Sequence, residues 1–111
     1  MAGCLFCKLI ADPDFQALHR DDDVVAISDI NPQGPVHFLV VPVRHVETIG
    51  ELDDDRLLGR IFAVAHELAR RNGIADGGYR LVFNQGSNGG QTVYHVHLHV
   101  IGGRQMTWPP G

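Results

Sequence analysis

Three of the seven histidines in this chain alternate with apolar residues close to its C-terminal end. Residues 94–101 read Tyr-His-Val-His-Leu-His-Val-Ile. A period of two predicts a β-strand that places His95, His97 and His99 on one face, with Cα atoms about 6.6 Å apart. A neutral imidazole carries a lone pair near neutral pH, so this row can supply a nucleophile. The alternative is a strand whose histidines simply face solvent.

A polar, glycine-rich loop at residues 84–92 comes directly before these histidines and reads Asn-Gln-Gly-Ser-Asn-Gly-Gly-Gln-Thr. Backbone N–H groups aimed at a phosphate stabilise the charge that develops on its oxygens during attack at phosphorus. We expect the N–H groups of Gly90, Gln91 and Thr92, with the side chain of Asn84, to do this. Taken alone, a loop of this composition is an ordinary connection between strands.

Residues 90–100 resemble the signature of the histidine triad (HIT) superfamily, in which three histidines alternate with apolar residues. They are most similar to its Hint branch, the purine nucleoside phosphoramidases. Residues 4–8, 29–35, 37–42 and 102–111 resemble the same branch. The resemblance implies one α+β HIT domain over residues 1–111: an antiparallel half-barrel sheet of about five strands, one long helix and a short N-terminal helix. It also implies a homodimer joined through helices and edge strands.

The activity that the resemblance implies is nucleotidyl hydrolysis or transfer on purine nucleoside 5′-phosphoramidates, such as adenosine 5′-monophosphoramidate. The nucleophile would be His97, which would carry a covalent nucleotidyl group on Nε2 while Nδ1 donates to a fixed acceptor. His99 would bind the phosphate and give a proton to the leaving group, and the Thr92 hydroxyl would lie near that group. His95 completes the catalytic row. The chemistry needs no cofactor.

The nucleoside site also follows from the resemblance. Asp29 matches the carboxylate that accepts both ribose hydroxyls, and His37 matches a buried supporting histidine. Trp108 would shape the leaving-group side of a partner subunit's site, or it is a plain packing residue. An apolar slot for the base, which could equally be core packing, is formed by Phe6, Ile27, Ile30 and Leu39. The full expected substrate-binding set is Asp29, Ile30, Asn84, Gly90, Gln91, Thr92, His99, His37, Phe6, Ile27, Leu39 and Trp108.

A metal site is the remaining implication. HIT proteins that have Cys-x-x-Cys and a basic residue before a histidine after the second strand hold a structural zinc ion. Here the matching residues are Cys4, Cys7 and His45, with His95 as the fourth ligand of a closed tetrahedral site. The alternative is that the two cysteines are small apolar residues on a short helix.

The elements that must position these residues follow from periodicity and turn residues. We expect a short helix over residues 4–11 and strands over 24–29 and 36–41, joined by a Pro- and Gly-containing turn at 31–35. Apolar residues at i, i+3 and i+4 predict a long helix over 54–71 with Asp53 as its N-cap. Strands over 79–84 and 93–101 complete an antiparallel meander.

Composition limits the partners. The 111 residues carry a formal net charge of −4, and dispersed basic residues give no footprint for nucleic acid. Because no apolar run approaches the ~20 residues of a membrane span and no signal peptide is evident, we expect a cytoplasmic protein without a membrane partner. Two cysteines do not form a secreted disulfide scaffold.

Two other functions stay open from the sequence. One is a metallohydrolase in which all three histidines of the row hold a catalytic metal ion; their spread along a strand disfavours this. The other is a nucleotide-binding or interaction module with weak or vestigial hydrolase activity. A dinucleoside polyphosphate hydrolase is a variant of the first hypothesis. The residues do not distinguish adenosine from guanosine.

Overall fold

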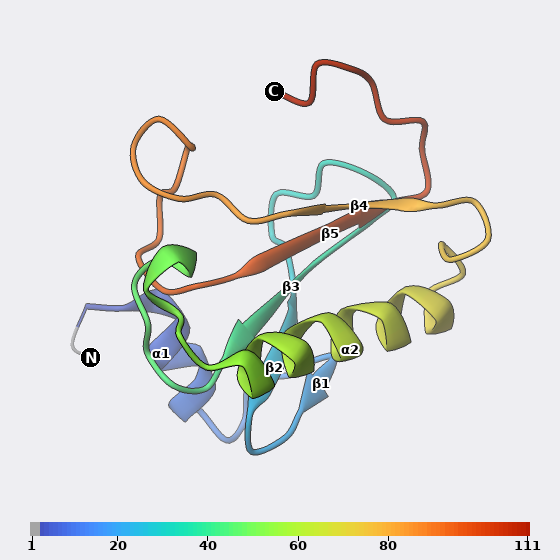
Figure 1. The fold of residues 1–111 in the computed structure, drawn as a ribbon. Helices are drawn as coiled ribbons and strands as arrows, with labels where there is room; N and C mark the ends of the chain where they lie inside the picture. The colour runs from blue at the N-terminus through green and yellow to red at the C-terminus, as the bar shows by residue number, and fades with distance from the viewer. Residues whose placement is uncertain (1–2) are drawn as a thin grey trace.

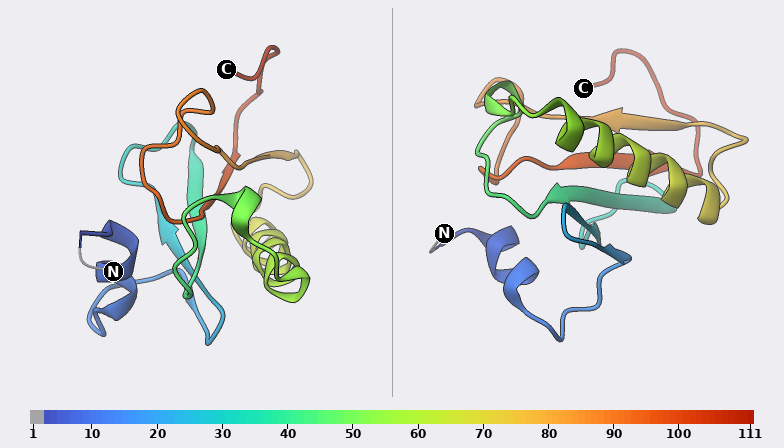
Figure 2. Two further views of the ribbon diagram at one scale, coloured as in Figure 1. Left: turned by 60° about the vertical axis from the view of Figure 1, so that its left-hand side comes forward. Right: turned by 60° about the horizontal axis from the view of Figure 1, so that its bottom comes forward.

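The structure is a computed structural model and describes residues 3–111. One open antiparallel sheet forms the centre of the molecule, with a long helix on one side and a short helix on the other (Figures 1 and 2). In chain order the elements are α1 (Leu5–Ala11), β1 (His19–Arg20), β2 (Val24–Ser28), β3 (Val36–Pro42), the 3₁₀ turn η1 (Ile49–Glu51), α2 (Asp55–Arg71), β4 (Tyr79–Val82) and β5 (Leu98–Gly102). This confirms the predicted α+β architecture.

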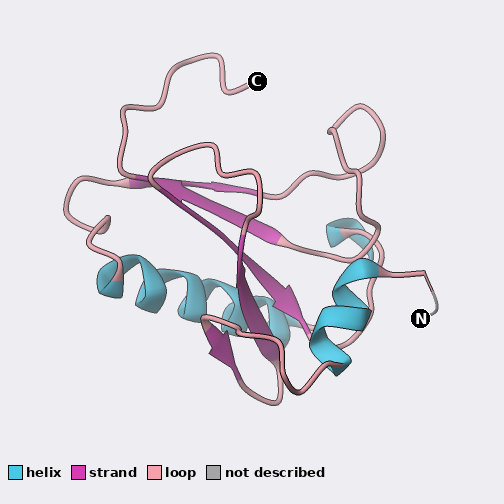
Figure 3. Cartoon of the chain, turned by 180° about the vertical axis from the view of Figure 1, so that it is seen from behind, coloured by secondary structure: helices cyan, strands magenta, loops and turns pink. Residues whose placement is uncertain are grey.

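The order of strands in the sheet is β1-β2-β3-β5-β4, and all neighbours are antiparallel. The last strand therefore lies between β3 and β4, and the predicted simple meander is wrong on this point. The chain leaves β3, crosses one face of the sheet as α2, forms the edge strand β4 and then returns between the two (Figure 3). This return places β5, and with it His99, in the interior of the sheet.

Strands β2 and β3 are apolar on both faces because each face is covered by a helix. Val24 and Ala26 belong to the core cluster that contains the buried face of α2. Val25 and Ile27 belong to the cluster that contains Phe6 of α1. The continuous Val- and Ile-rich sequence of β2 therefore reflects burial on two sides rather than a one-sided alternation.

Helix α2 buries one stripe of side chains at helical spacing. Its N-cap is Asp54, whose carboxylate accepts a hydrogen bond from the N–H of Leu57 at 3.0 Å, so the helix begins one residue later than predicted. The helix stops at Asn72, followed by Gly73 with a φ of +74°. The buried stripe consists of Leu57, Ile61, Val64, Ala65, Leu68 and Ala69.

Strand β5 begins at Leu98, five residues later than the alternation predicts. Leu98 pairs with Val40 of β3, so the next partner in the ladder for Val96 would be Pro42. Proline has no N–H to donate, and the N–H of Val96 instead donates to the carbonyl of Val46 at 2.7 Å. The segment that carries His95 and His97 is thus an irregular approach to the strand.

Other boundaries differ by small amounts, and β1 was not predicted. Strand β1 consists of only two residues and pairs with β2, so its sequence is too short to show a period.

The C-terminal segment, residues 103–111, runs away from the sheet (Figure 1), and Trp108 is 82% exposed. Among residues 3–111, no helix has the length and apolar character required to cross a bilayer.

Candidate active site

A cavity of about 720 Å³ opens between α1, the end of β2, the middle of β3 and the segment around the start of β5. Its volume lies within the range of small-molecule sites. The apolar lining includes Leu5, Phe6, Leu9, Phe15, Ile27, Ile30, Leu39 and Val93. The polar lining includes Gln16, Ser28, Asp29, Asn84, Thr92, His97 and His99. An apolar slot with polar groups toward one end suits an apolar ring joined to a polar, charged group.

His97 lies against this cavity, and its two ring nitrogens have different environments. The residue is 8% exposed, and Nδ1–H donates to the carbonyl oxygen of His95 at 2.8 Å. Because a carbonyl can only accept, the proton of the neutral ring is on Nδ1 and Nε2 holds the lone pair. Phe6 packs edge-on against the ring, with centroids 5.1 Å apart. The ring is therefore fixed in orientation and in tautomer.

His99 lies beside His97, with ring centroids 5.0 Å apart, and belongs to a second hydrogen-bonded chain. The backbone N–H of Gln33 donates to Nδ1 of His37 at 2.9 Å, so a neutral His37 carries its proton on Nε2. That nitrogen lies 2.9 Å from Nδ1 of His99. His37 therefore donates to His99, and a neutral His99 carries its own proton on Nε2.

The same hydrogen bonds decide between a proton-carrying cluster and a metal site. Ligand atoms of Asp29, His37 and His99 lie close enough together to hold an ion. A metal-bound histidine presents a lone pair to the ion and usually donates from its other nitrogen. In His37 the other nitrogen accepts from Gln33, so Nε2 carries a hydrogen atom and cannot ligate. We interpret these residues as a proton-carrying cluster.

Burial determines the charge state of this cluster in the free protein. Desolvation, together with the neighbouring rings of His97 and His37, lowers the pKa of His99 to about 4, although the Asp29 carboxylate acts in the opposite direction. Desolvation also lowers the pKa of His37, again opposed by Asp29. Both rings are neutral at pH 7 in the free protein.

The glycine-rich loop uses more of its own donors than the sequence suggested. The N–H of Gly90 donates to Ser87 and that of Gln91 to Gly86, both within the loop. The Gln91 side chain is buried and braces the loop, donating to the carbonyl of Glu47 at 2.8 Å. The expectation that the Gly90 and Gln91 N–H groups face a phosphate therefore does not hold in this conformation, because internal hydrogen bonds occupy them. Asn84, Gly90 and Thr92 do line the cavity, whereas Gln91 does not appear in its lining among residues 3–111.

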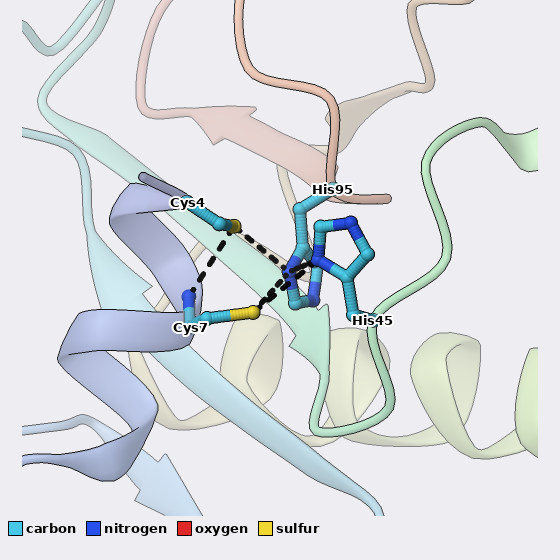
Figure 4. Close-up of side chains that lie close together, drawn as sticks. All are labelled: Cys4, Cys7, His45 and His95. Carbon is cyan, nitrogen blue, oxygen red and sulfur yellow. Dashed lines mark hydrogen bonds between the residues drawn. The ribbon is translucent and has the colours of Figure 1, made fainter. Parts of the chain in front are cut away.

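His95 lies on the same face as His97 but next to the N-terminal end of α1, in a cluster with Cys4, Cys7 and His45 (Figure 4). It is fully buried, and its Nε2–H donates to the carbonyl of Pro42 at 2.8 Å, which leaves a lone pair on Nδ1. That Nδ1 lies 3.4 Å from the sulfur of Cys4 and 3.2 Å from Nδ1 of His45. The predicted common face for the three histidines is confirmed. His95 and His97 both pack against Phe6 of α1, and His99 pairs with Leu39 of the same apolar cluster. Val96, Leu98 and Val100 lie instead in the core cluster that contains α2. His95 faces the Cys/His cluster and does not share a metal ion with His97 and His99.

The Cys/His cluster fits a tetrahedral zinc ion. With Zn–S near 2.3 Å and Zn–N near 2.0–2.1 Å, the ligand-to-ligand edges of a tetrahedral site are about 3.3–3.8 Å, and those between sulfur and nitrogen are about 3.5 Å. The separations in the structure are 3.2 Å between Cys7 Sγ and His45 Nδ1, and 3.5 Å between Cys7 Sγ and His95 Nδ1. The Pro42 carbonyl holds His95 in the tautomer that a metal requires, the usual outer contact of a ligating histidine.

The remaining predicted residues are distributed as follows. Phe6, Ile27, Ile30 and Leu39 line the apolar part of the cavity, whereas Trp108 is absent from the cavity lining among residues 3–111 and lies on the exposed C-terminal segment. His37 lies behind His99. Six lining residues are absent from the site predicted from the sequence: Leu5, Leu9, Phe15, Gln16, Ser28 and Val93. The i, i+4 spacing of Leu5 and Leu9 within the expected short helix was the available signal for that wall.

This combination of an open antiparallel sheet, a cavity and paired histidines defines a class, and comparisons with known proteins identify it. The model of the HIT domain family matches residues 12–106. Adenylylsulfatase HINT1 of Arabidopsis thaliana is 50% identical over 112 residues, covering 96% of this chain and 76% of that protein. A 14 kDa zinc-binding protein of Brassica juncea is 48% identical, covering 96% of this chain and 98% of that protein.

Solved structures agree. A HIT family hydrolase from Legionella pneumophila Philadelphia 1 superposes with a TM-score of 0.91 at 49% identity, covering 97% of this chain and 99% of that one. The chain belongs to the HIT domain family.

Proposed function

We propose that this protein is a nucleotidyl hydrolase that uses His97 as a covalent nucleophile on purine nucleoside 5′-phosphate derivatives. The observation that carries the proposal is the hydrogen bond from His97 Nδ1 to the His95 carbonyl, at a ring that lies against the cavity. It keeps a lone pair on Nε2 without prior deprotonation, which is what a nucleophilic imidazole needs. The names of the HIT family relatives, a hydrolase and an adenylylsulfatase, support the reaction class.

The reaction has two displacements at phosphorus. His97 Nε2 attacks the α-phosphorus, the bond to the leaving group breaks, and a nucleotidyl-histidine forms. Water then attacks the same phosphorus and releases the nucleoside monophosphate and the free imidazole. Asn84 and the Thr92 hydroxyl line the cavity where donors to the phosphate and the leaving group are required. Asp29, at the end of β2, would accept the ribose hydroxyls, and the apolar lining would hold the base.

Two leaving groups deserve comparison, because they differ in what they demand of His99. An amine leaving from a phosphoramidate must gain a proton, whereas sulfate leaving from adenosine 5′-phosphosulfate is a stable anion without one. We propose the phosphoramidate as substrate because a cluster of two histidines and a carboxylate adjoins the nucleophile and because the sequence resembles the phosphoramidase branch. The relative named adenylylsulfatase favours the second substrate.

Zinc would have a structural role in this proposal. Cys4, Cys7, His45 and His95 would fill its four positions, which leaves none for a water molecule or substrate. The ion would join α1 to the segment before β5 and so hold one wall of the cavity. The relative named as a zinc-binding protein supports the assignment. The chemistry itself would need no cofactor.

The proposal also includes a homodimer and, as predicted from the sequence, a cytoplasmic location. Strand β4 lies at the edge of the sheet, and its residues are only half-buried in the single chain. The alternative function is a nucleotide-binding module with vestigial activity. The observation that favours it is the loop, in which the N–H groups of Gly90 and Gln91 donate to carbonyls of the loop itself and so do not serve a phosphate.

A direct test is turnover of adenosine 5′-phosphoramidate and adenosine 5′-phosphosulfate, followed by chromatography of the released AMP. The wild-type protein should release AMP, and His97→Ala should not, while its affinity for AMP stays within a few-fold of wild type. Tight binding of AMP without turnover of either compound by the wild type would support the binding module instead.

A further inference from the structure

The Asp29 carboxylate contacts the histidine cluster as well as the cavity. Its Oδ1 accepts the N–H of Asn31 at 2.8 Å, which fixes the orientation of the group. Its Oδ2 lies 3.3 Å from Nε2 of His37 and 3.9 Å from Nδ1 of His99. The side chains of Asp29, His37 and His99 are 17%, 2% and 19% exposed. At this degree of burial a negative charge acts strongly on neighbouring rings.

The neutral cluster has no place for an additional proton between its two rings. His37 Nε2–H already points to His99 Nδ1, and the N–H of Gln33 prevents His37 from moving its proton to Nδ1. If His99 gains a proton on Nδ1, two N–H groups face each other and need another acceptor. The Oδ2 atom of Asp29 is within reach of both nitrogens.

We propose that Asp29 is a positioning residue for the acid form of His99, a role separate from any contact with ribose. In the neutral form His37 donates to His99. In the cationic form His37 Nε2–H and His99 Nδ1–H both donate to Asp29 Oδ2, and His99 Nε2–H stays directed at the substrate. This inference rests on the proposed function, since it concerns the proton that the leaving amine requires.

The proton balance of the reaction closes with this assignment. His97 Nε2 forms a bond to phosphorus while the P–N bond of the substrate breaks and its electron pair goes to the amine nitrogen. That nitrogen takes the proton from Nε2 of cationic His99. His99 becomes neutral with its remaining proton on Nδ1, still donated to Asp29 Oδ2, so this intermediate differs in tautomer from the neutral His99 of the free protein. In the second step the water oxygen bonds to phosphorus and gives a proton to Nε2 of His99. The bond from phosphorus to Nε2 of His97 breaks, and His99 is again a cation.

The charges around His99 agree with this role. The ring of His37 faces it from β3 and the ring of His97 from the approach to β5, and both disfavour a cation. Asp29, at the end of β2, favours it. Removing the Asp29 charge should therefore lower the pKa of His99 further and reduce its capacity as an acid.

The test compares Asp29→Asn with the wild type on four substrates. These are adenosine 5′-phosphoramidate and adenosine 5′-phosphosulfate, each with normal ribose and as the 2′,3′-dideoxy form, which has no hydroxyl for Asp29 to bind. The quantity of interest is kcat/KM for the phosphoramidate divided by kcat/KM for the phosphosulfate. We expect Asp29→Asn to lower this ratio on the order of tenfold, the effect of about one pKa unit at His99, in the ribose and dideoxy series alike.

Two kinetic outcomes would overturn the proposal. An unchanged ratio in the dideoxy series would show that Asp29 serves only the ribose. Equal losses for both leaving groups would show general damage to the site. Asp22→Asn, which removes the same charge from an exposed position outside the cavity lining, is the matched control and should leave the ratio unchanged.

A measurement without turnover separates this proposal from the proposed function. NMR titration of the histidine rings in the free protein should give a lower pKa for His99 in Asp29→Asn than in the wild type. The same pKa in both proteins would overturn the role of Asp29. Absence of turnover by the wild type would contradict the proposed function and leave the titration to decide the electrostatic claim.

Discussion

His97 and His99 lie side by side, yet the structure gives them different hydrogen-bond partners and therefore different tasks. A backbone carbonyl fixes the proton of His97 on Nδ1, whereas His37 donates to the corresponding nitrogen of His99. Only the first arrangement leaves a lone pair on Nε2. Which histidine is the nucleophile and which is the acid thus follows from the hydrogen-bond partner of each Nδ1 atom, not from the position of each histidine in the motif.

The acid role of His99 predicts how pH should affect the two leaving groups. The pKa of His99 is lowered to about 4, so its cationic fraction grows as pH falls toward that value. The phosphoramidate needs this cation and the phosphosulfate does not, while His97 attacks both. From about pH 8 to about pH 5 the ratio of their kcat/KM values should rise by up to tenfold per unit. His99→Gln should abolish this rise, and a flat ratio in the wild type would contradict the acid role.

At the scale of elements, α1 is a wall of the cavity, and α1 and its N-cap residue carry two of the four proposed zinc ligands, Cys7 and Cys4. Loss of zinc should therefore release α1 from the sheet and weaken the site at the same time. A loss of only about 1 kcal/mol lowers the Tm of a domain near this size by about 4–8 °C, so chelation or Cys7→Ser should produce at least that decrease. Calorimetry with and without a chelator, together with AMP binding and zinc content, tests this. A zinc-free protein with unchanged Tm would refute the structural role.

A second junction joins α2 to the β1–β2 turn through Asp21. Burial acts to raise the pKa of Asp21, but hydrogen bonds from His19, from the N–H groups of Val24 and Asp23, and from Arg60 outweigh it, so the pKa is well below its ordinary value. Because the folded-state pKa is depressed, this stability is present above the unfolded pKa and is lost as pH falls.

Asp21→Asn should accordingly lower the free energy of unfolding by about 1–2 kcal/mol at pH 7. The difference from wild type should shrink below about pH 4, where Asp21 of the unfolded chain is protonated. Urea titrations of both proteins at pH 7 and below about pH 4 measure this difference in the free energy of unfolding. The exposed Asp22→Asn is the control, and an equal cost at both pH values would contradict the electrostatic account.

The elements were largely predictable from the sequence, whereas the division of the histidines between two sites came from the family resemblance and not from the periodicity of the motif. The α2 stripe leaves a clear period and the two-sided strands leave continuous apolar runs, whereas the two-residue β1 leaves neither. Alternation correctly placed His95, His97 and His99 on one face and Val96, Leu98 and Val100 in the core. It could not reveal that Pro42 ends the ladder and that Val96 bonds to Val46 instead.

The Cys/His cluster, whose residues come from distant segments of the chain, could likewise not be derived from local sequence patterns. Cys-x-x-Cys carries no information on His45 or His95, which only the folded chain brings to it. Resemblance to the HIT superfamily supplied that connection before the structure did. Nothing in the sequence indicated that the Gln33 N–H would fix the tautomer of His37.

At the scale of the whole molecule, β4 and the C-terminal segment are incomplete in a single chain. Strand β4 is an edge strand, and Trp108 is exposed on a segment that leaves the sheet. We expect a dimer of about 24 kDa, twice the 12.2 kDa of one chain, in size-exclusion chromatography with light scattering. Trp108→Ala should keep this mass and lower kcat/KM, as for a residue at the edge of a partner's site. A wild-type monomer at micromolar concentration would contradict the expectation.

The central claim is covalent transfer of the nucleotidyl group to His97, and intact-mass spectrometry after rapid quenching tests it most directly. The wild-type protein mixed with adenosine 5′-phosphoramidate should gain the mass of one adenylyl group within a turnover, on a peptide that contains His97. His97→Ala should gain none. Rapid turnover by the wild type without any trapped adduct, or the same adduct in His97→Ala, would contradict the account.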